Sequence, residues 1–203
     1  MNEFESVKNL KVDDIVYMMP LHEYHSEELY ALLKSNKTDI LKWTTWQNCP
    51  ESISVTRELI RNFESQKLKG GSLTMGVWIS KVLAGLITVY STDWKNSSAY
   101  LGYWVSPNHR GRGVATRSRN GLISKLFNMD ILEKVFIKCE QDNYPSQRVA
   151  NKLHFINYEC IQINRKGCDK SDGYVTYVKF KIDETETVAN QKQMMLIDGR
   201  CLT

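Results

Sequence analysis

The sequence has no long apolar run. A membrane-spanning helix needs about 18 consecutive apolar residues, and no window of the 203 residues comes close to that length. It also lacks the basic and then apolar N-terminal stretch that is typical of a secretion signal. These two absences predict a cytoplasmic protein without a membrane partner.

Cysteine pairs are missing as well. The five cysteines are odd in number and show no Cys-x-x-Cys spacing, which argues against a disulfide framework and against a zinc site. We therefore expect no bound metal. Cys139 and Cys160 lie in apolar runs and are predicted to be small core residues.

The chain has little excess charge of either sign. Its net charge is +4, and its 42% hydrophobic and 25% charged residues are typical of a soluble globular protein of one domain. The positive excess is local, since four arginines lie close together at Arg110, Arg112, Arg117 and Arg119. A nucleic-acid-binding protein would spread its basic residues over a wider face, so we expect no nucleic-acid partner.

These arginines surround a glycine-rich turn. The segment Tyr103 to Arg119 begins as an apolar strand end, breaks at Ser106-Pro107-Asn108, and passes through Arg110-Gly111-Arg112-Gly113 into helical spacing. A strand, a glycine-rich turn and a helix in this order direct free backbone N–H groups and the positive end of a helix dipole toward an anion. The segment therefore predicts a phosphorylated ligand.

The spacing excludes two common phosphate sites. The turn lacks the Gly-Lys-Ser/Thr ending of a nucleotide P-loop, and it lacks the third glycine of the dinucleotide fingerprint. It does contain Arg-x-x-Gly-x-Ala, at Arg110, Gly113 and Ala115. That pattern is similar to the pyrophosphate loop of the GNAT superfamily of N-acetyltransferases.

The flanking residues extend the resemblance. Gly102-Tyr103-Trp104 precedes the loop, and Asn143-Tyr144-Pro145-Ser146 and Phe155 follow it. In order and spacing these motifs resemble the RimJ/RimL branch of the superfamily. The resemblance implies an α/β fold (α+β mixed sheet), in which helices flank a mixed β-sheet and two adjacent parallel strands splay apart.

We expect residues 15–182 to form this domain, after a loose N-terminal segment (1–14) and before a C-terminal tail (183–203) of unassigned role. The hydrophobic pattern predicts strands at 15–21, 72–79, 82–90, 98–105, 134–139, 156–164 and 174–182, and helices at 23–34, 37–46, 51–69, after the glycine loop and from Pro145.

The resemblance implies acetyl-coenzyme A as the acetyl donor. Backbone N–H groups from Arg112 through Val114 to Ala115 would hold its pyrophosphate. Gly111 and Gly113 would allow a close approach because they carry no Cβ.

Arginine side chains around the loop have two expected roles. Those of Arg110, Arg112 and Arg117 would add positive charge beside the pyrophosphate. Arg119 is expected to lie on a solvated helix face.

The thioester is expected along Tyr103, Trp104 and Val105. In this family a bulge in the strand aims a backbone N–H at the thioester oxygen, and such a donor is worth ~3 kcal/mol in the transition state. The Trp104 side chain could pack in the core or contact the substrate.

Asn143 and Ser146 match the Asn-x-x-Ser of the family. The resemblance implies that the asparagine reaches the pantetheine arm and that the serine gives a proton to the departing thiolate. Ser146 could equally bond the backbone at a helix start.

The general base is the point at which the sequence departs from the family. Arg165 stands where the RimJ/RimL branch is expected to place a glutamate, and the remaining candidates are Glu159, Asp169 and Asp172. We take Glu159 as the catalytic candidate. An α-amine with a pKa of ~8 needs less help than a lysine at ~10.4, which favours an α-amine acceptor.

The acceptor pocket is expected around aromatic side chains, namely Trp43, Trp46, Tyr100 and Tyr103, with Trp94 in the same poorly patterned region. Three functions stay open. The acceptor could be the N-terminus of a ribosomal or similar protein, or a small-molecule amine such as an aminoacyl-nucleotide antibiotic. The chain could also be a regulator that binds acyl-coenzyme A without turnover. The resemblance further suggests a possible homodimer.

The four histidines are not expected in the site. His154 stands where many GNAT proteins have glycine, so we expect a left-handed helix end there. His22, His25 and His109 are expected to be solvated loop residues.

Overall fold

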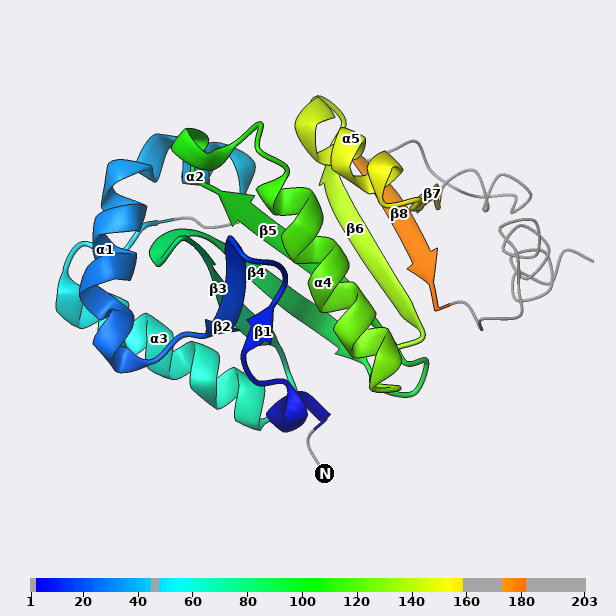
Figure 1. Ribbon diagram of the computed structural model, residues 1–203, viewed down its shortest axis with the longest axis horizontal. Coiled ribbons are helices and arrows are strands. Elements are labelled where there is room, and N and C mark those ends of the chain that lie inside the picture. Colours follow the sequence, from blue (N-terminus) through cyan, green and yellow to red (C-terminus); the bar gives the residue numbers. More distant parts are fainter. Residues whose placement is uncertain (1–2, 45–47, 159–172, 182–203) are drawn as a thin grey trace, which may run out of the picture.

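The computed structural model describes residues 3–44, 48–158 and 173–181 (Figure 1). They build a mixed sheet of eight strands in the order β1-β2-β3-β4-β5-β6-β8-β7. The strands are β1 (Leu10–Lys11), β2 (Val16–Pro20), β3 (Leu73–Ile79), β4 (Val82–Asp93), β5 (Ser98–Val105), β6 (Lys134–Glu140), β7 (Ile156–Asn157) and β8 (Tyr174–Phe180). The predicted mixed α/β class is confirmed.

Helices cover both faces of the sheet. One face carries α1 (Ser26–Ser35), α2 (Lys37–Trp43) and α3 (Ile53–Leu68), and the other carries α4 (Val114–Asn128) and α5 (Tyr144–Lys152) (Figure 1). Short 3-10 turns lie at Glu3–Ser6, Glu23–His25 and Pro107–His109. In the described residues no helix is long and apolar enough to cross a membrane.

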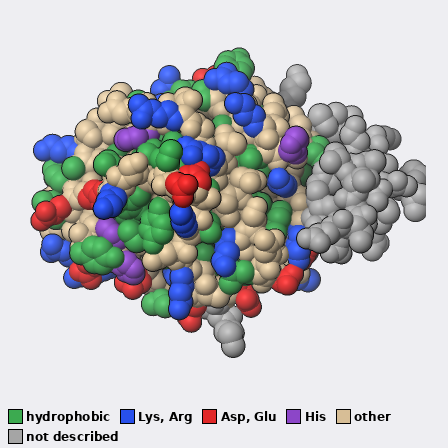
Figure 2. All heavy atoms as spheres, in the orientation of Figure 1, with side chains coloured by type: hydrophobic (Ala, Val, Ile, Leu, Met, Phe, Trp, Pro, Cys, Tyr) green, Lys and Arg blue, Asp and Glu red, His purple; other side chains and the backbone are tan. Residues whose placement is uncertain are grey.

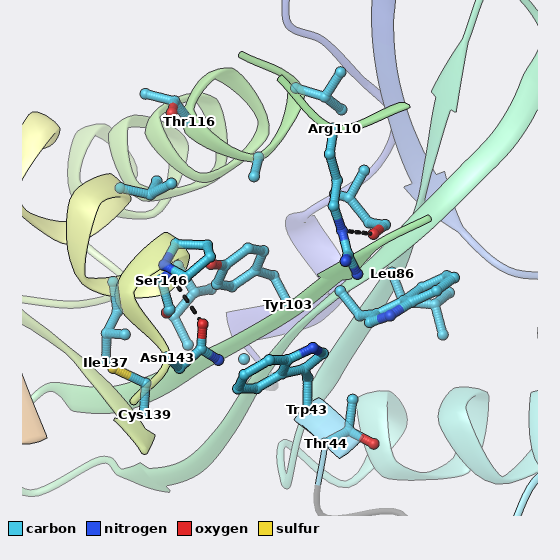
Figure 3. A pocket seen from close by; sticks show the side chains of 18 of the residues that line it. Trp43, Thr44, Leu86, Tyr103, Arg110, Thr116, Ile137, Cys139, Asn143 and Ser146 are labelled. Carbon is cyan, nitrogen blue, oxygen red and sulfur yellow. Dashed lines mark hydrogen bonds between the residues drawn. The ribbon is translucent and has the colours of Figure 1, made fainter. Parts of the chain in front are cut away.

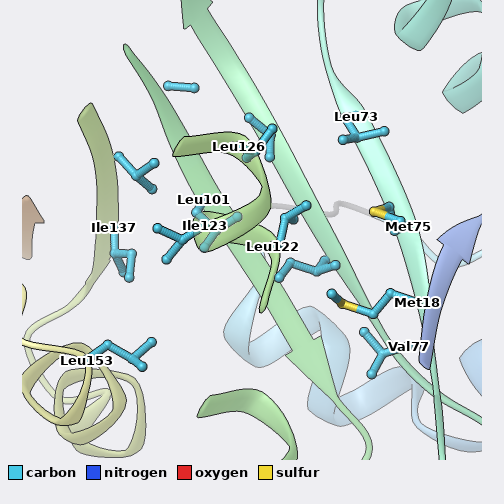
Figure 4. Close-up of a cluster of buried hydrophobic side chains, with 14 of the residues drawn as sticks. Met18, Leu73, Met75, Val77, Leu101, Leu122, Ile123, Leu126, Ile137 and Leu153 are labelled. Atoms are coloured by element: carbon cyan, nitrogen blue, oxygen red, sulfur yellow. The ribbon is translucent and has the colours of Figure 1, made fainter. Parts of the chain in front are cut away.

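Helix α4 is fixed to the sheet by an apolar stripe. Leu122, Ile123 and Leu126 follow the spacing of one helix face, and all three are buried. They pack over strand residues that include Met75 and Leu101 (Figure 4). Burying each such side chain contributes about 1.5–3 kcal/mol, so the helix start is held at a fixed place over the sheet.

The predicted splay lies between β5 and β6. These strands are parallel, and their pairing runs only from Ser98↔Lys134 to Tyr100↔Phe136. Beyond that point β5 stays paired with β4 up to Val105, while β6 stays paired with β8 up to Glu140. The two strands therefore separate at their carboxyl ends, and the expected splayed arrangement is confirmed.

The start of the chain is more ordered than the expected loose segment. Phe4 and Val7 are fully buried, and Leu10–Lys11 pairs with β2. The Phe4 and Trp94 rings are 5.1 Å apart, and the Trp94 indole N–H donates to the Gly70 carbonyl oxygen at 3.2 Å. Trp94 therefore lies at the amino end of β5, away from the splay, and its expected place in the acceptor region is wrong.

Charged side chains are mixed on the face shown in Figure 2. Lysine and arginine lie among acidic and polar groups there, and the described residues on this side form no broad basic surface.

The remaining expected strand, 156–164, is described only as the short β7, because residues 159–172 lie outside the described residues. His154 has a φ of 58°, which confirms the left-handed helix end.

His25 is buried, with 6% exposure, so the expectation of a solvated loop residue is wrong. Its Nδ1 accepts a hydrogen bond from the His22 backbone N–H at 3.0 Å, and its ring packs 5.0 Å from that of Trp78. Burial lowers the pKa of His25, an effect that Glu28 partly opposes. The folded protein therefore prefers neutral His25.

We expect the free energy of unfolding to fall as the pH drops below the ordinary histidine pKa of about 6.5, because the unfolded chain then binds a proton that the folded chain resists. One proton limits the slope to about 1.4 kcal/mol per pH unit. Urea unfolding at pH 7 and pH 5 measures this loss. In a His25→Asn variant the loss should shrink, and an equal loss would show that His25 is not its source.

Candidate active site

A cavity of about 670 Å³ opens where β5 and β6 separate (Figure 3). Its walls come from β4, β5 and β6, and from the helices on both faces of the sheet. The glycine loop and Trp43 of α2 both line it. A ligand that filled it would reach both faces of the sheet.

Strand alternation divides the cavity into two halves. Residues that share a face with Leu101 point toward α4 and α5, and these include Tyr103 and Cys139. Residues that alternate with them, such as Lys138 and Glu140, point toward the face that carries α1 and α2. Two different molecules can therefore approach the gap from opposite faces.

The glycine loop presents backbone donors to the first half. Gly111 and Gly113 have φ values of 76° and 72°, and Gly113 is the residue that precedes α4. No side chain caps α4, so the N–H groups of its first turn have no partner within the helix. Val114, Ala115 and Thr116 line the cavity. This is an anion site of the expected kind.

Positive φ explains why these positions hold glycine. A Cβ at Gly111 would meet nothing within 4 Å, and one at Gly113 would meet only the Arg117 Nε, at 3.9 Å. Crowding within the chain therefore does not require glycine here, whereas the left-handed backbone does.

Two of the arginines around the loop form ion pairs. Arg110 forms a bidentate ion pair with Asp39 of α2, and its Nε donates to the Val105 carbonyl oxygen at 2.9 Å. Arg117 pairs with Asp13 at 2.6 Å. These ion pairs offset the charge that the two side chains are expected to add beside a pyrophosphate, and that role stays a prediction. Arg112 is exposed and lies outside the cavity lining.

Asp39 joins the loop to α2. Besides Arg110, it accepts a 2.7 Å hydrogen bond from the Trp104 indole N–H. Burial raises the pKa of Asp39, but the hydrogen bonds from Arg110 and Trp104 outweigh burial and hold it below its usual value. The carboxylate thus stays ionised and keeps Trp43 of the same helix at the cavity. The Trp104 side chain packs in the core.

The strand β5 offers an open edge instead of a bulge. Its pairing with β4 is regular from Leu101 to Val105, and the register shifts only between Tyr90 and Asp93. The expected bulge at Tyr103–Val105 is therefore wrong. The edge that faces β6 has no strand partner over the same residues in the described ladders, so its N–H groups can bond a ligand.

Asn143 and Ser146 stand at the start of α5, across the gap from β5. The Asn143 Oδ1 accepts a hydrogen bond from the Ser146 backbone N–H at 3.1 Å, and both residues line the cavity (Figure 3). Ser146 is buried, with 4% exposure. Pro145 fits this first turn because its missing N–H would have no partner there.

The family described as an acetyltransferase (GNAT) domain matches residues 16–156. The chain belongs to the GNAT acetyltransferases. As a member of this family it is an N-acetyltransferase that depends on acetyl-coenzyme A. The cavity fits that donor, because three suitable groups line it. They are the uncapped start of α4, the unpaired edge of β5 and the buried hydroxyl of Ser146.

Curated relatives and solved structures agree with this assignment. The ribosomal-protein-serine acetyltransferase of Escherichia coli (strain K12) is 26% identical over 155 residues, which are 76% of this chain and 87% of the relative. The putative ribosomal N-acetyltransferase YdaF of Bacillus subtilis (strain 168) is 26% identical over 72% of this chain and 80% of its own.

Two solved structures have the same fold. RimL with coenzyme A has a TM-score of 0.74 at 20% identity, covering 85% of this chain and 98% of its own. The microcin self-immunity acetyltransferase MccE, with acetyl-coenzyme A and AMP, has a TM-score of 0.73 at 24% identity. The match covers 84% of this chain and 94% of MccE.

The acceptor half of the GNAT cavity is only partly described. Trp43 lines the cavity, and its contact with the acceptor stays a prediction. Tyr103 also lines the cavity, but on the side of α4 and α5, where the donor is expected and not the acceptor. Tyr100 lies outside the lining, where its ring packs against Tyr90 and Phe136. The predicted Trp46 and the base candidates Glu159, Asp169 and Asp172, with Arg165, lie outside the described residues. Among described lining residues, Glu140 is the one acid.

Sequence reasoning missed several residues of this GNAT site. Asp39 gave no signal, because its partner Arg110 is 71 residues away. Cys139 was predicted as a core residue, which its burial confirms, but it also lines the cavity. Alternation along the strand that ends in Glu140 could have indicated that residue.

Arg119 is the largest departure from expectation. It was predicted on a solvated face of α4, yet it is fully buried. Its guanidinium lies 3.4 Å from the centre of the Tyr103 ring, and its Nη2 lies 3.5 Å from the Ser146 Oγ.

Proposed function

We propose that this GNAT enzyme transfers acetyl from acetyl-coenzyme A to the α-amine of a protein N-terminus, with a ribosomal protein as the first candidate acceptor. The observation that carries the proposal is the cavity that crosses the splay, because it admits the donor from the α4 and α5 face and the acceptor from the other. Direct attack of the amine in a ternary complex follows from this arrangement. The similarity to the E. coli ribosomal-protein-serine acetyltransferase supports the choice of acceptor.

Bound acetyl-coenzyme A supplies the acetyl group in thioester form. The first-turn N–H groups of α4 would hold its phosphates, and the open edge of β5 would bond its polar arm. Asn143 would orient the arm through the amide nitrogen that its helix-capping bond leaves available. Ser146 would hold a proton at its Oγ, next to the place of the sulfur.

The acceptor half supports an α-amine with little need for a strong base. An α-amine with a pKa of about 8 is already partly neutral at pH 7, so water or a modest base can take its proton. Glu159 is our candidate for that base. The side chains of Trp43, Tyr90 and Tyr174 offer apolar surface for the residue that follows the amine.

A second candidate acceptor is a small-molecule amine, such as an aminoacyl-nucleotide, whose acetylation would give resistance or self-immunity. Two features favour it: aromatic rings in the acceptor half can stack on a base, and Arg165 replaces the glutamate expected in the RimJ/RimL branch. The fold shared with MccE, which was solved with AMP, is consistent with it.

Transfer of labelled acetyl from acetyl-coenzyme A into a cell extract separates the two candidates. The extract is divided into protein and small-molecule fractions, and the Gly113→Trp variant serves as the control. Label at the N-terminus of one or a few proteins, lost in the control, is the expected result. Label confined to small molecules would replace it with the second candidate, and no label in either fraction would overturn transfer to both.

A further inference from the structure

Arg119 is a buried cation with no acidic neighbour in the part of the chain that the structure describes. It lies on α4 with 0% exposure, and none of the ion pairs among the described residues includes it. Its Nε and Nη1 have no hydrogen-bond partner there. A charge in this situation is costly unless an anion or a strong acceptor comes close to it.

The side chains that interact with the Arg119 guanidinium belong to the wall of the cavity. The Tyr103 ring stacks on its guanidinium at 3.4 Å, and the Ser146 Oγ is 3.5 Å from its Nη2. Cys139 is close enough for the two groups to affect each other's titration. Tyr103, Cys139 and Ser146 line the cavity together (Figure 3). Arg119 is not part of the lining, but it contacts Tyr103 and Ser146.

A purely structural role does not explain an arginine at this position. Arg119 lies three and four residues before Leu122 and Ile123, so it continues the apolar stripe of α4. An apolar side chain of similar volume would fill the same space without a buried charge, and such replacements are often neutral or stabilising. The charge itself therefore calls for a function.

We propose that Arg119 is a positioning residue that stabilises, through the Ser146 hydroxyl, the negative charge that forms on the coenzyme A sulfur. The proposal deepens the donor site described above and rests on it. As the acceptor nitrogen bonds to the acetyl carbon, the carbon–sulfur bond breaks and its electron pair stays on the sulfur. The amine gives up one proton, and the sulfur ends with one, so the products are the amide and the free thiol.

Each partner has a defined part in this arrangement. The Ser146 O–H points its proton at the sulfur, and the Arg119 N–H donates to the Ser146 oxygen, which makes that hydroxyl a better donor. The Tyr103 ring faces the guanidinium and holds it in place by a cation–π contact. Arg119 thus acts on the sulfur without touching the substrate.

The titratable groups around the site leave the positive charge uncancelled. Burial lowers the pKa of Arg119, against raising effects of Tyr103 and Cys139, and a guanidinium starts so high that it stays protonated at neutral pH. Burial raises the pKa of Cys139, and Glu140 raises it further, against the lowering effects of Ser146 and Arg119. Cys139 is therefore a neutral thiol, and Tyr103 faces Arg119 with its ring.

The test uses coenzyme A with its free thiol and needs no acceptor. The pKa of the bound thiol is read from the ultraviolet absorbance of the thiolate over a pH series, with the complex of desulfo-coenzyme A subtracted to remove the protein's own thiols and phenols. We expect this pKa to be about one unit higher in Arg119→Met than in the unmodified chain, a tenfold change in proton affinity. Arg119→Lys should restore part of the difference.

Three controls separate this role from a structural one. Arg119→Met should unfold at the same or a higher temperature, since it removes a buried charge. Ser118→Ala, on the same helix and equally buried, should leave the thiol pKa unchanged. In a Ser146→Ala background, Arg119→Met should shift the thiol pKa clearly less, because the connecting hydroxyl is gone.

The outcomes are distinguishable. An unchanged thiol pKa in Arg119→Met, with coenzyme A still bound, overturns the role of Arg119 and leaves the proposed function intact. Failure of the unmodified chain to bind coenzyme A overturns the donor site and this inference together. If Arg119→Met shifts the thiol pKa equally in the unmodified chain and in the Ser146→Ala background, Arg119 does not act through the Ser146 hydroxyl.

Discussion

Gly113→Trp is expected to lower the affinity for acetyl-coenzyme A by about a hundredfold, through the loss of one or two charge-assisted hydrogen bonds of about 1.5–3 kcal/mol each. Gly113 precedes α4, and the uncapped N–H groups of the next residues line the cavity. An indole at this position would cover those donors. Isothermal titration with acetyl-coenzyme A measures the change.

Gly113→Ala is the matched control for backbone strain. Both variants place a Cβ at a φ of 72°, so both should lose about 1 kcal/mol of folding free energy. The alanine Cβ has only the Arg117 Nε near it, at 3.9 Å, and should change affinity far less than the indole does. Equal affinity losses in the two variants would mean that strain, and not coverage of the donors, is responsible.

Ser146→Ala is expected to lower kcat by about a hundredfold, the lower end of the range for general acids, because a hydroxyl is a modest acid and a thiolate needs little help. The KM for acetyl-coenzyme A should change little, since in our proposal the loop before α4 holds the phosphates. Steady-state rates with the acceptor identified by labelling give both constants.

Ser118→Ala controls for the loss of a buried hydroxyl. Ser118 is 2% exposed, and its Oγ has no hydrogen-bond partner among the described residues. It does not line the cavity, so kcat should stay as it is. If Ser146→Ala and Ser118→Ala both leave kcat unchanged, Ser146 serves only the start of α5.

The parts of the site that could be predicted are those encoded by local sequence. Glycine at Gly111 and Gly113, with helical spacing after them, is enough to predict an uncapped helix start, because positive φ and free N–H groups are properties of neighbouring residues. The Asn143 to Ser146 motif is predictable for the same reason. The roles of these residues in catalysis stay predictions.

The parts that were missed depend on contacts between distant segments. Asp39 neutralises Arg110 across 71 residues, which no local pattern reports. Arg119 is a different case, because its spacing from Leu122 and Ile123 places it on the buried stripe although its side chain is charged. His25 was misplaced in the same way. For a polar residue that stands at the spacing of an apolar helix face, the spacing predicts burial better than the polarity of the side chain does.

The parallel ladder between β5 and β6 is short, with three residue pairs among the residues that the structure describes, and it joins two parts of the sheet that we call leaves. One leaf is β1 to β5, and the other is β6 to β8. A molecule bound in the gap would contact both leaves, because residues of β5 and of β6 line it, and would act as a reversible crosslink. Its binding energy then adds to the resistance of the leaves to separation. Product release would therefore remove one connection between the leaves, while the packing of α4 against both of them remains.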